Sequence, residues 1–424
     1  GRHRGRRRLP GRHRGARRAA GALTVAPAPP ALLEIGAVLL GIGVLSRVAA
    51  RAGVPPIVAP LAVGLLATGA GPLPDGFAPP PDVTDAGAGI ALVLLLFSLG
   101  LDQTRADRAA VVRSASRAGL VDATVNLVPG LLGGMLLGWG VREAVLLGGA
   151  TWASSPVAAR WIIGNLGRVG NRETPGALSL LTLENLGMCV FLPLAAALCT
   201  PAGGATTAVS VLLTAAAVAG AAWVARDRGP ALRRPVFGHA DDVVLTVAGV
   251  ALVVAGLAAE VEVPAAAGAL LAGAVLAGPV TTTEPARAVL GLLRHLSAAG
   301  AFVSLGLLAD IDGPGIVVAA LLFAVVGGVT KLTAGWWAAR HLRPRARLRT
   351  GSALIARGEF SVALALIGHQ TGLDPDLVAV TAVYVAVTLV AGGLMAGTLD
   401  PSRGDVGAVR AGRAPVRRRR AARP

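Results

Sequence analysis

Long apolar runs recur along the chain and are separated by short polar segments. Most of them are close to the roughly 20 residues that an α-helix needs to cross the hydrocarbon core of a bilayer. We count about thirteen runs, at residues 31–49, 54–71, 86–102, 118–139, 142–165, 176–200, 205–224, 242–260, 263–279, 293–311, 314–338, 350–371 and 376–398. Only 15 % of the residues are charged, against about 25 % in soluble domains. The sequence therefore predicts an all-α polytopic membrane protein.

The two ends of the chain differ from this apolar middle. Residues 1–30 are basic and of low complexity, and residues 400–424 include the four consecutive arginines Arg417–Arg420. Such compositions cannot bury enough apolar surface to fold alone. We expect two disordered basic tails on either side of a transmembrane domain over residues 31–399.

The net charge of +17 does not by itself indicate a nucleic-acid-binding protein, because the arginines are spread over the loops between the runs and over the two tails. The two cysteines show no metal-ligand spacing, and the six histidines form no HxxxH or HExxH pattern. No nucleophile–base pair stands out. We therefore expect neither an enzyme nor a cofactor-binding protein, and no nucleic-acid partner.

The loop charges predict an orientation in the membrane. Alternate loops hold nearly all the arginines outside the tails, and the positive-inside rule places these loops and the C-terminus in the cytoplasm. The opposite loops are acidic apart from Arg142, and they hold Asp75, Asp82, Glu260, Glu262, Asp312, Asp374 and Asp376. We expect a multi-pass plasma-membrane protein with its N-terminus outside, although the basic N-terminal tail opposes this orientation.

The two halves of the apolar region repeat one another. Val54-Pro55 matches Val263-Pro264 at an offset of 209, and Ser98–Leu101 matches Ser304–Leu307 at an offset of 206. The matched spans are seven apart, which is an odd shift, so the halves have opposite topology. Inverted repeats are typical of secondary transporters. We expect repeat one at about 31–200, a linker helix at about 205–224 and repeat two at about 242–398.

Three ionisable residues lie deep within apolar runs. At about 1.5 Å per residue, Glu184, Lys331 and Glu359 each lie roughly 13–15 Å from the end of a run. Lys331 is the only lysine, since the other thirty-nine of the 40 basic residues are arginines. A desolvated lysine can release its proton, whereas arginine stays charged. Their similar depth predicts that the three charges meet and take part in ion or proton transfer.

Each of these residues also has a structural alternative. Lys331 can reach toward the lipid headgroups, Glu184 and Lys331 can form a purely structural ion pair, and Glu359 can neutralise the neighbouring Arg357. Two further acids lie near the ends of runs and are expected to be boundary or packing residues: Glu34 and Asp122.

Two of the runs contain residues that interrupt a helix. One run carries Thr151, Ser154, Ser155 and Pro156, and proline removes a backbone donor while hydroxyl groups can satisfy freed backbone groups. The segment equivalent by the repeat is Arg357-Gly358-Glu359. Two interrupted helices at matching positions predict a crossing in mid-membrane, with helix ends and free carbonyls facing a cation. An ordinary proline kink is the alternative for the first run.

With these motifs the chain resembles the monovalent cation:proton antiporters, specifically the Kef-type cation:proton antiporter-2 branch, over about residues 31–398. The segments that carry the resemblance are Leu32–Gly36, Leu95–Asp102, Ala153–Val157, Leu183–Leu186, Phe302–Leu307, Lys331 and Arg357–Phe360. The resemblance implies a homodimer of inverted-repeat protomers of the sodium/proton-antiporter-like fold, with a crossed pair of broken helices.

The resemblance also implies the site and the activity. The family's ion site uses two adjacent polar residues that usually end in an aspartate; these are Glu184 and Asn185 here, and Asn185 stands at the usual aspartate position. Lys331 matches the family's lysine. The implied activity is exchange of Na⁺ or K⁺ for protons by alternating access, with the cation held by Glu184 and Asn185 and displacing the Lys331 ammonium, which then loses its proton.

Two other functions remain open on the same fold. A cation channel or facilitator would carry a flux without counter-movement of protons. A sensor that does not transport would show no flux at all.

Overall fold

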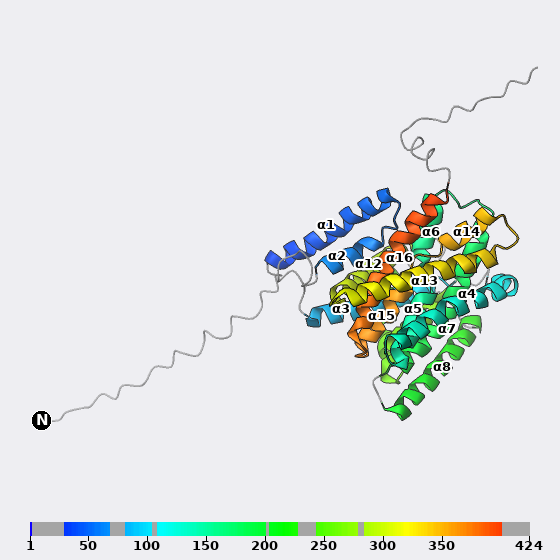
Figure 1. Ribbon diagram of the computed structural model, residues 1–424. Coiled ribbons are helices and arrows are strands. Elements are labelled where there is room, and N and C mark those ends of the chain that lie inside the picture. Colours follow the sequence, from blue (N-terminus) through cyan, green and yellow to red (C-terminus); the bar gives the residue numbers. More distant parts are fainter. Residues whose placement is uncertain are drawn as a thin grey trace, which may run out of the picture. The chain divides into compact units, whose positions relative to one another are not determined.

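The structure is a computed structural model that describes residue 1 and residues 29–67, 81–103, 108–200, 203–227, 243–278 and 284–400. Every regular element in these ranges is an α-helix (Figure 1). The helices are α1 (Pro29–Ala52), α2 (Val58–Leu66), α3 (Pro81–Leu101), α4 (Arg108–Leu136), α5 (Val141–Trp152), α6 (Pro156–Asn165), α7 (Thr174–Leu198), α8 (Gly204–Asp227), α10 (Val243–Glu260), α11 (Ala265–Leu276), α12 (Glu284–Leu308), α13 (Pro314–Ala338), α14 (Pro344–Ser352), α15 (Glu359–Gln370) and α16 (Pro375–Thr398). The two predicted tails fall almost entirely on residues 2–28 and 401–424, which lie outside the described residues.

The helices agree with the apolar runs of the sequence. Each of the thirteen runs coincides with one helix or, for runs 142–165 and 350–371, with two helices in succession. Eight of the described helices are both long and apolar enough to cross a membrane. On α8 and α10, large apolar side chains such as Leu212, Trp223, Leu245 and Leu257 are exposed, which suits contact with lipid tails. The prediction of an all-α multi-pass membrane protein is confirmed.

The two predicted interruptions meet each other. Residues 153–155 are extended between α5 and α6, and α6 starts with Pro156 at a position where a helix needs no N–H donor. The second interruption separates α14 from α15. The backbone N–H of Ser155 donates to the carbonyl oxygen of Ala356 over 2.8 Å, so the two non-helical segments are in contact. The prediction of a crossed pair of broken helices is confirmed, and the first interruption is more than a proline kink.

Four glycines bring the two predicted repeats together. Gly64 on α2 lies against Gly306 on α12, and Gly100 on α3 lies against Gly273 on α11. A Cβ at any of the four would overlap backbone atoms of the facing helix. Gly64 and Gly273 are separated by the sequence offset of 209, and Gly100 and Gly306 by the offset of 206. Each helix of one repeat thus packs on the non-equivalent helix of the other, as a two-fold pseudosymmetry requires.

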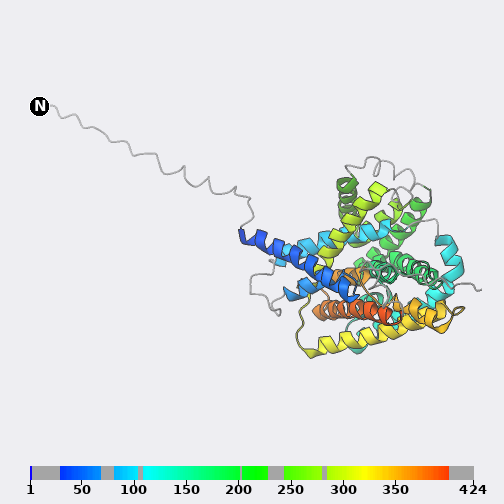
Figure 2. The same cartoon turned by 90° about the horizontal axis from the view of Figure 1, so that it is seen from above.

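Within residues 41–400, which pack as one unit, the broken helices lie in the interior. One group of helices contains α2, α3, α10, α11 and α12, and a second contains α4, α5, α7 and α13–α16. In the second group α13 runs beside α16 and α14 (Figures 1 and 2). Helix α15 contacts both groups and is buried from Glu359 to Gly368. The crossing is therefore shielded on all sides by other helices.

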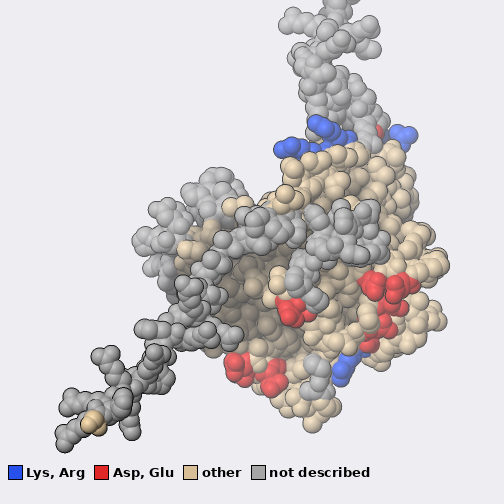
Figure 3. Space-filling model, turned by 90° about the vertical axis from the view of Figure 1, so that its left-hand side faces the viewer, with Lys and Arg blue, Asp and Glu red and all other residues tan. Residues whose placement is uncertain are grey.

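Charged side chains are few on the surface and are sorted by sign. Figure 3 shows one face on which most atoms belong to uncharged residues. Most of the described acidic atoms lie in the lower half of that face, and the basic atoms lie at its upper edge apart from one small group below. This separation follows the alternation of basic and acidic loops along the sequence.

Candidate functional site

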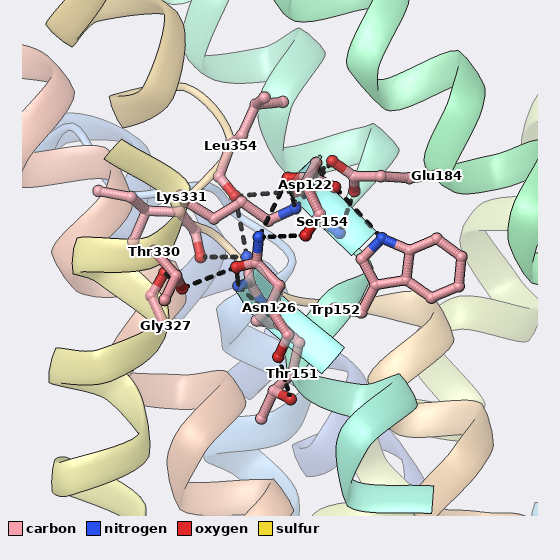
Figure 4. Close-up of polar contacts among 12 residues, drawn as sticks. Asp122, Asn126, Thr151, Trp152, Ser154, Glu184, Gly327, Thr330, Lys331 and Leu354 are labelled. Carbon is pink, nitrogen blue, oxygen red and sulfur yellow. Dashed lines mark hydrogen bonds and ion pairs between the residues drawn. The ribbon is translucent and has the colours of Figure 1, made fainter. Parts of the chain in front are cut away.

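A buried lysine bridges two carboxylates from different helices (Figure 4). The Nζ atom of Lys331 on α13 donates to Oδ1 of Asp122 on α4 over 2.7 Å and to Oε1 of Glu184 on α7 over 2.9 Å. The Lys331 side chain is 0 % exposed, and each carboxylate side chain is 1 % exposed. The predicted meeting of Glu184 and Lys331 is confirmed, and the alternative in which Lys331 reaches the headgroups is excluded.

The other donors around the two carboxylates complete their hydrogen bonding. Asn126 Nδ2 donates to Asp122 Oδ1 over 3.1 Å, and Trp152 Nε1 donates to Asp122 Oδ2 over 3.2 Å. The N–H of Ser154 donates to Glu184 Oε2 over 2.5 Å, and its hydroxyl lies 3.2 Å from Glu184 Oε1. All four carboxylate oxygens therefore accept at least one hydrogen bond. This is the pattern of two ionised carboxylates around one ammonium.

Asp122 corrects the expectation that it is a boundary or packing residue. The apolar run begins at residue 118, which places Asp122 near an end, but α4 begins at Arg108, fourteen residues before Asp122. The polar first turns of the helix hide its true start in the sequence. A usable signal was the spacing of Asp122 and Asn126, two polar residues one helical turn apart within an apolar run.

Arg357 occupies the space between the ends of the broken helices. Its guanidinium donates to the carbonyl oxygen of Thr151 over 2.8 and 3.1 Å, to that of Leu354 over 2.9 Å and to that of Ile355 over 3.1 Å. The Thr151 carbonyl lies in the last turn of α5, and the carbonyls of Leu354 and Ile355 come just after α14. The C-terminal end of a helix leaves carbonyl oxygens unpaired and carries partial negative charge. The carbonyls that we expected to face a cation therefore face a fixed guanidinium.

Asn126 connects Arg357 to the carboxylate cluster. Its Oδ1 atom accepts from Thr330 Oγ1 over 2.8 Å and from Arg357 Nη2 over 3.4 Å, while its Nδ2 donates to Asp122. The backbone carbonyl of Asn126 accepts from the hydroxyl of Thr151 over 3.0 Å. The interruption in α5 is thereby held in register with α4 and α13.

Glu359 lies at the opposite, N-terminal ends of the broken helices. Ser155, the N-cap of α6, donates its hydroxyl to Glu359 Oε2 over 2.7 Å. Gly358 leaves room for the Ser155 side chain, because a Cβ on Gly358 would overlap the Cβ and Oγ atoms of Ser155. No ion pair joins Glu359 to Lys331 or Arg357 in the described part of the chain. Contrary to expectation, Glu359 therefore neither joins the Lys331 cluster nor neutralises Arg357. It lies at the first residue of α15, beside the positive N-terminal helix ends.

Asn185 follows Glu184 on α7 but lies outside the hydrogen-bonded cluster. It is 8 % exposed, and its buried Oδ1 atom has no hydrogen-bond partner among the described residues. A buried amide oxygen without a donor is available as a cation ligand. Over the same residues, no group of three or more His, Cys, Asp or Glu side chains is arranged to hold a resident metal ion.

Three known proteins with similar sequence or fold are named as antiporters or antiporter subunits. Residues 35–399 match the model of the family described as sodium/hydrogen exchanger, transmembrane. The K(+)/H(+) antiporter subunit KhtU of Bacillus subtilis (strain 168) is 29 % identical over 317 residues, which are 72 % of this chain and 77 % of that protein. The ammonium/H(+) antiporter subunit AmhT of Alkalihalophilus pseudofirmus is 27 % identical over 285 residues, 65 % of this chain and 72 % of that protein. The sodium proton antiporter MjNhaP1 from Methanocaldococcus jannaschii, solved at pH 8, has a TM-score of 0.61 at 14 % identity, covering 87 % of this chain and 99 % of its own, and shares the fold.

Proposed function

The chain belongs to the sodium/hydrogen exchanger family, and on that premise we propose that it exchanges a monovalent cation, K⁺ or Na⁺, for protons at the cluster of Asp122, Glu184 and Lys331. One observation carries this proposal: a buried ammonium is held by two carboxylates that would also bind a cation. The names of KhtU and AmhT support antiport of small monovalent cations. The family and the fold point to a transporter and not to an enzyme.

The exchange follows from competition for the carboxylate oxygens. A cation enters beside Glu184, takes Asn185 Oδ1 as a further oxygen ligand and displaces the ammonium of Lys331. The lysine, now close to a second positive charge and removed from its partners, gives its proton to water.

The charges balance in a simple way. Two carboxylates and one ammonium carry a net charge of −1, and two carboxylates, one cation and a neutral lysine also carry −1. An empty cluster with a neutral lysine would carry −2 in a buried site, which is strongly unfavourable. Only loaded states then move across the membrane, so that one proton is exchanged for one cation.

Alternating access needs two parts that move past one another. We assign the moving part to α4–α7 and α13–α16, which hold every residue of the cluster, and the supporting part to α2, α3 and α10–α12. This division rests on the two groups of helices and on the inverted repeats at about residues 31–200 and 242–398. We place the chain in the Kef-type branch, as a homodimer, because its segments Leu95–Asp102, Leu183–Leu186 and Arg357–Phe360 resemble those of that branch.

The orientation is part of the same proposal. The arginine-rich loops alternate along the chain with loops that are acidic, two of which hold Asp312, Asp374 and Asp376. By the positive-inside rule, the arginine-rich side and the C-terminus face the cytoplasm.

Reconstitution into proteoliposomes tests this function. Dissipation of an imposed pH gradient should follow addition of K⁺, Na⁺ or ammonium, each tested separately, and should be lost in Glu184→Gln and in Lys331→Met. Glu260→Gln, an exposed acid at the end of α10, is the matched control and should exchange at the wild-type rate. Cation flux without proton movement would indicate a channel, and absence of any flux in the folded wild type would indicate a sensor.

A further inference from the structure

A basic cavity opens on the arginine-rich side of the molecule. It has a volume of about 610 Å³ and is lined by α4, by the start of α7 and by the segment that follows α13. Its lining includes five basic side chains and, among the described residues, no carboxylate. The basic residues are Arg113, Arg117, Arg172, Arg340 and His341. We call this cavity the arginine vestibule.

Within the described residues, the arginines of the vestibule have no acidic partner. In the described part of the chain no ion pair joins any of the four to a carboxylate, and Arg340 lies over the ring of Trp337 at 5.4 Å. The first turn of α7 contributes Pro175 and Gly176 to the wall of the cavity and adds the partial positive charge of a helix N-terminus. Clustered positive charge in a concave, partly enclosed space raises the local concentration of anions.

The vestibule lies directly beside the carboxylate cluster. Its lining includes buried Ala118 on α4 and buried Leu180 on α7. Asp122 and Glu184 are each four residues further along these helices, so that about 6 Å of helix rise separates them from the lining. Ala118 and Leu180 belong to a small apolar cluster that closes this gap and that also contains Ala159, Leu181 and Leu354.

A cation that reaches the cluster from this side has to pass four arginines that form no ion pair with any described residue. Repulsion among like charges lowers the local cation concentration until an anion compensates them. Guanidinium groups bind phosphate oxygens in a two-pronged geometry, and the hydroxyl of Ser179 lines the same cavity. The volume of the vestibule accommodates a phosphate group and leaves space for a cation beside it.

We propose that the arginine vestibule binds a phosphate-bearing anion, either free in solution or as the headgroup of an acidic lipid, and that the bound anion makes cation entry to the cluster more favourable. The second half of this proposal rests on the proposed function. The first half is a statement about binding and stands without it.

Binding is tested on the purified full chain in a neutral detergent, with pyrophosphate as the probe and calorimetry at constant ionic strength as the readout. We expect saturable binding that is at least tenfold weaker in the double variant Arg117→Gln/Arg172→Gln. The control is Arg343→Gln/Arg345→Gln, which removes two exposed arginines of the same side that do not line the cavity. Equal pyrophosphate binding by wild type and the vestibule variant would overturn the proposal. It would also be overturned if neither protein binds pyrophosphate and the lipid effect described below is absent.

The effect on transport separates the two sources of phosphate. In vesicles of phosphatidylcholine, we expect pyrophosphate on the vestibule side to lower the cation concentration for half-maximal exchange at least threefold if the ligand is free. If the ligand is a lipid, replacing part of the phosphatidylcholine by phosphatidylglycerol has this effect without pyrophosphate. The vestibule variant should show a lowered value under every condition, because two of its four arginine charges are removed. If pyrophosphate or phosphatidylglycerol changes the half-maximal cation concentration equally in wild type and variant, the bound anion does not control cation entry. If the wild type binds the anion but shows no exchange, the proposed function alone is overturned.

Discussion

The ion pair of Asp122 and Lys331 makes a quantitative prediction about stability. Lys331→Met removes the ammonium and leaves two buried carboxylates whose oxygens lie 2.7 and 2.9 Å from the vacated nitrogen position. Breaking a buried ion pair by removing one partner costs about 3–5 kcal/mol of unfolding free energy. Asp122→Asn keeps an acceptor oxygen but removes the charge, and loss of a charge-assisted hydrogen bond costs about 1.5–3 kcal/mol.

The double variant should cost less than the sum of the two single variants. Without the lysine, the neutral side chain at position 122 no longer repels Glu184, which keeps its hydrogen bonds from Ser154. We expect a coupling energy of about 2 kcal/mol, within the range for residues in direct contact. The free energy of unfolding is measured in mixed micelles titrated with a denaturing detergent, for wild type, both single variants and the double variant.

A control cycle shows whether this coupling is specific. Lys331→Met combined with Glu260→Gln, which lies at an exposed helix end, should be additive within about 0.5 kcal/mol. If the Asp122 cycle is equally additive, the two side chains do not interact in the folded protein, and the cluster described here is incorrect.

Three further predictions concern the crossing, the helix contacts and the charge balance. Arg357→Gln should destabilise the protein by about 3–5 kcal/mol, because carbonyls of two helix ends lose a buried charged donor; an unchanged unfolding midpoint would show that the guanidinium is not needed there. Gly100→Ala should cost about 1–3 kcal/mol because its Cβ overlaps the backbone of α11, whereas Gly249→Ala on α10 meets nothing within 4 Å and should not destabilise; equal melting temperatures for the two variants would contradict this packing. Exchange should be one proton per cation with no net charge moved per cycle, so a clamped membrane potential should not change the equilibrium distribution of the cation, and cation accumulation driven by potential alone would contradict the constant site charge of −1.

The sequence predicts the helices well because bilayer thickness is a strong constraint. Apolar runs of sufficient length can satisfy their backbone only as helices, so the thirteen runs all coincide with helices. The interruptions were also predictable, because Pro156 cannot continue a helix and the second half repeats the first at Arg357–Glu359. The pairing of Glu184 with Lys331 followed from depth alone, since buried opposite charges at one level have few other partners.

The rest of the site depends on tertiary arrangement. The role of Asp122 in the cluster was not predicted, because the first turns of α4 are rich in arginine and resemble a loop. The start of the helix at Arg108 is therefore not evident from the sequence. The separation of Arg357 from Glu359 could not be predicted from their adjacency. It arises because one side chain lies at two negative helix ends and the other at two positive ends, an arrangement that exists only once the broken helices cross.

Proton release on cation binding tests most directly whether a cation and the lysine compete for the same carboxylates. Purified protein in weakly buffered detergent solution is titrated with K⁺ or Na⁺, and the released protons are counted with a pH indicator, using choline as the control cation. We predict saturable release of up to one proton per chain by the wild type, and none by Lys331→Met or by Glu184→Gln. Undiminished release by both variants would contradict the central claim, because the protons would then come from groups outside the cluster of Asp122, Glu184 and Lys331.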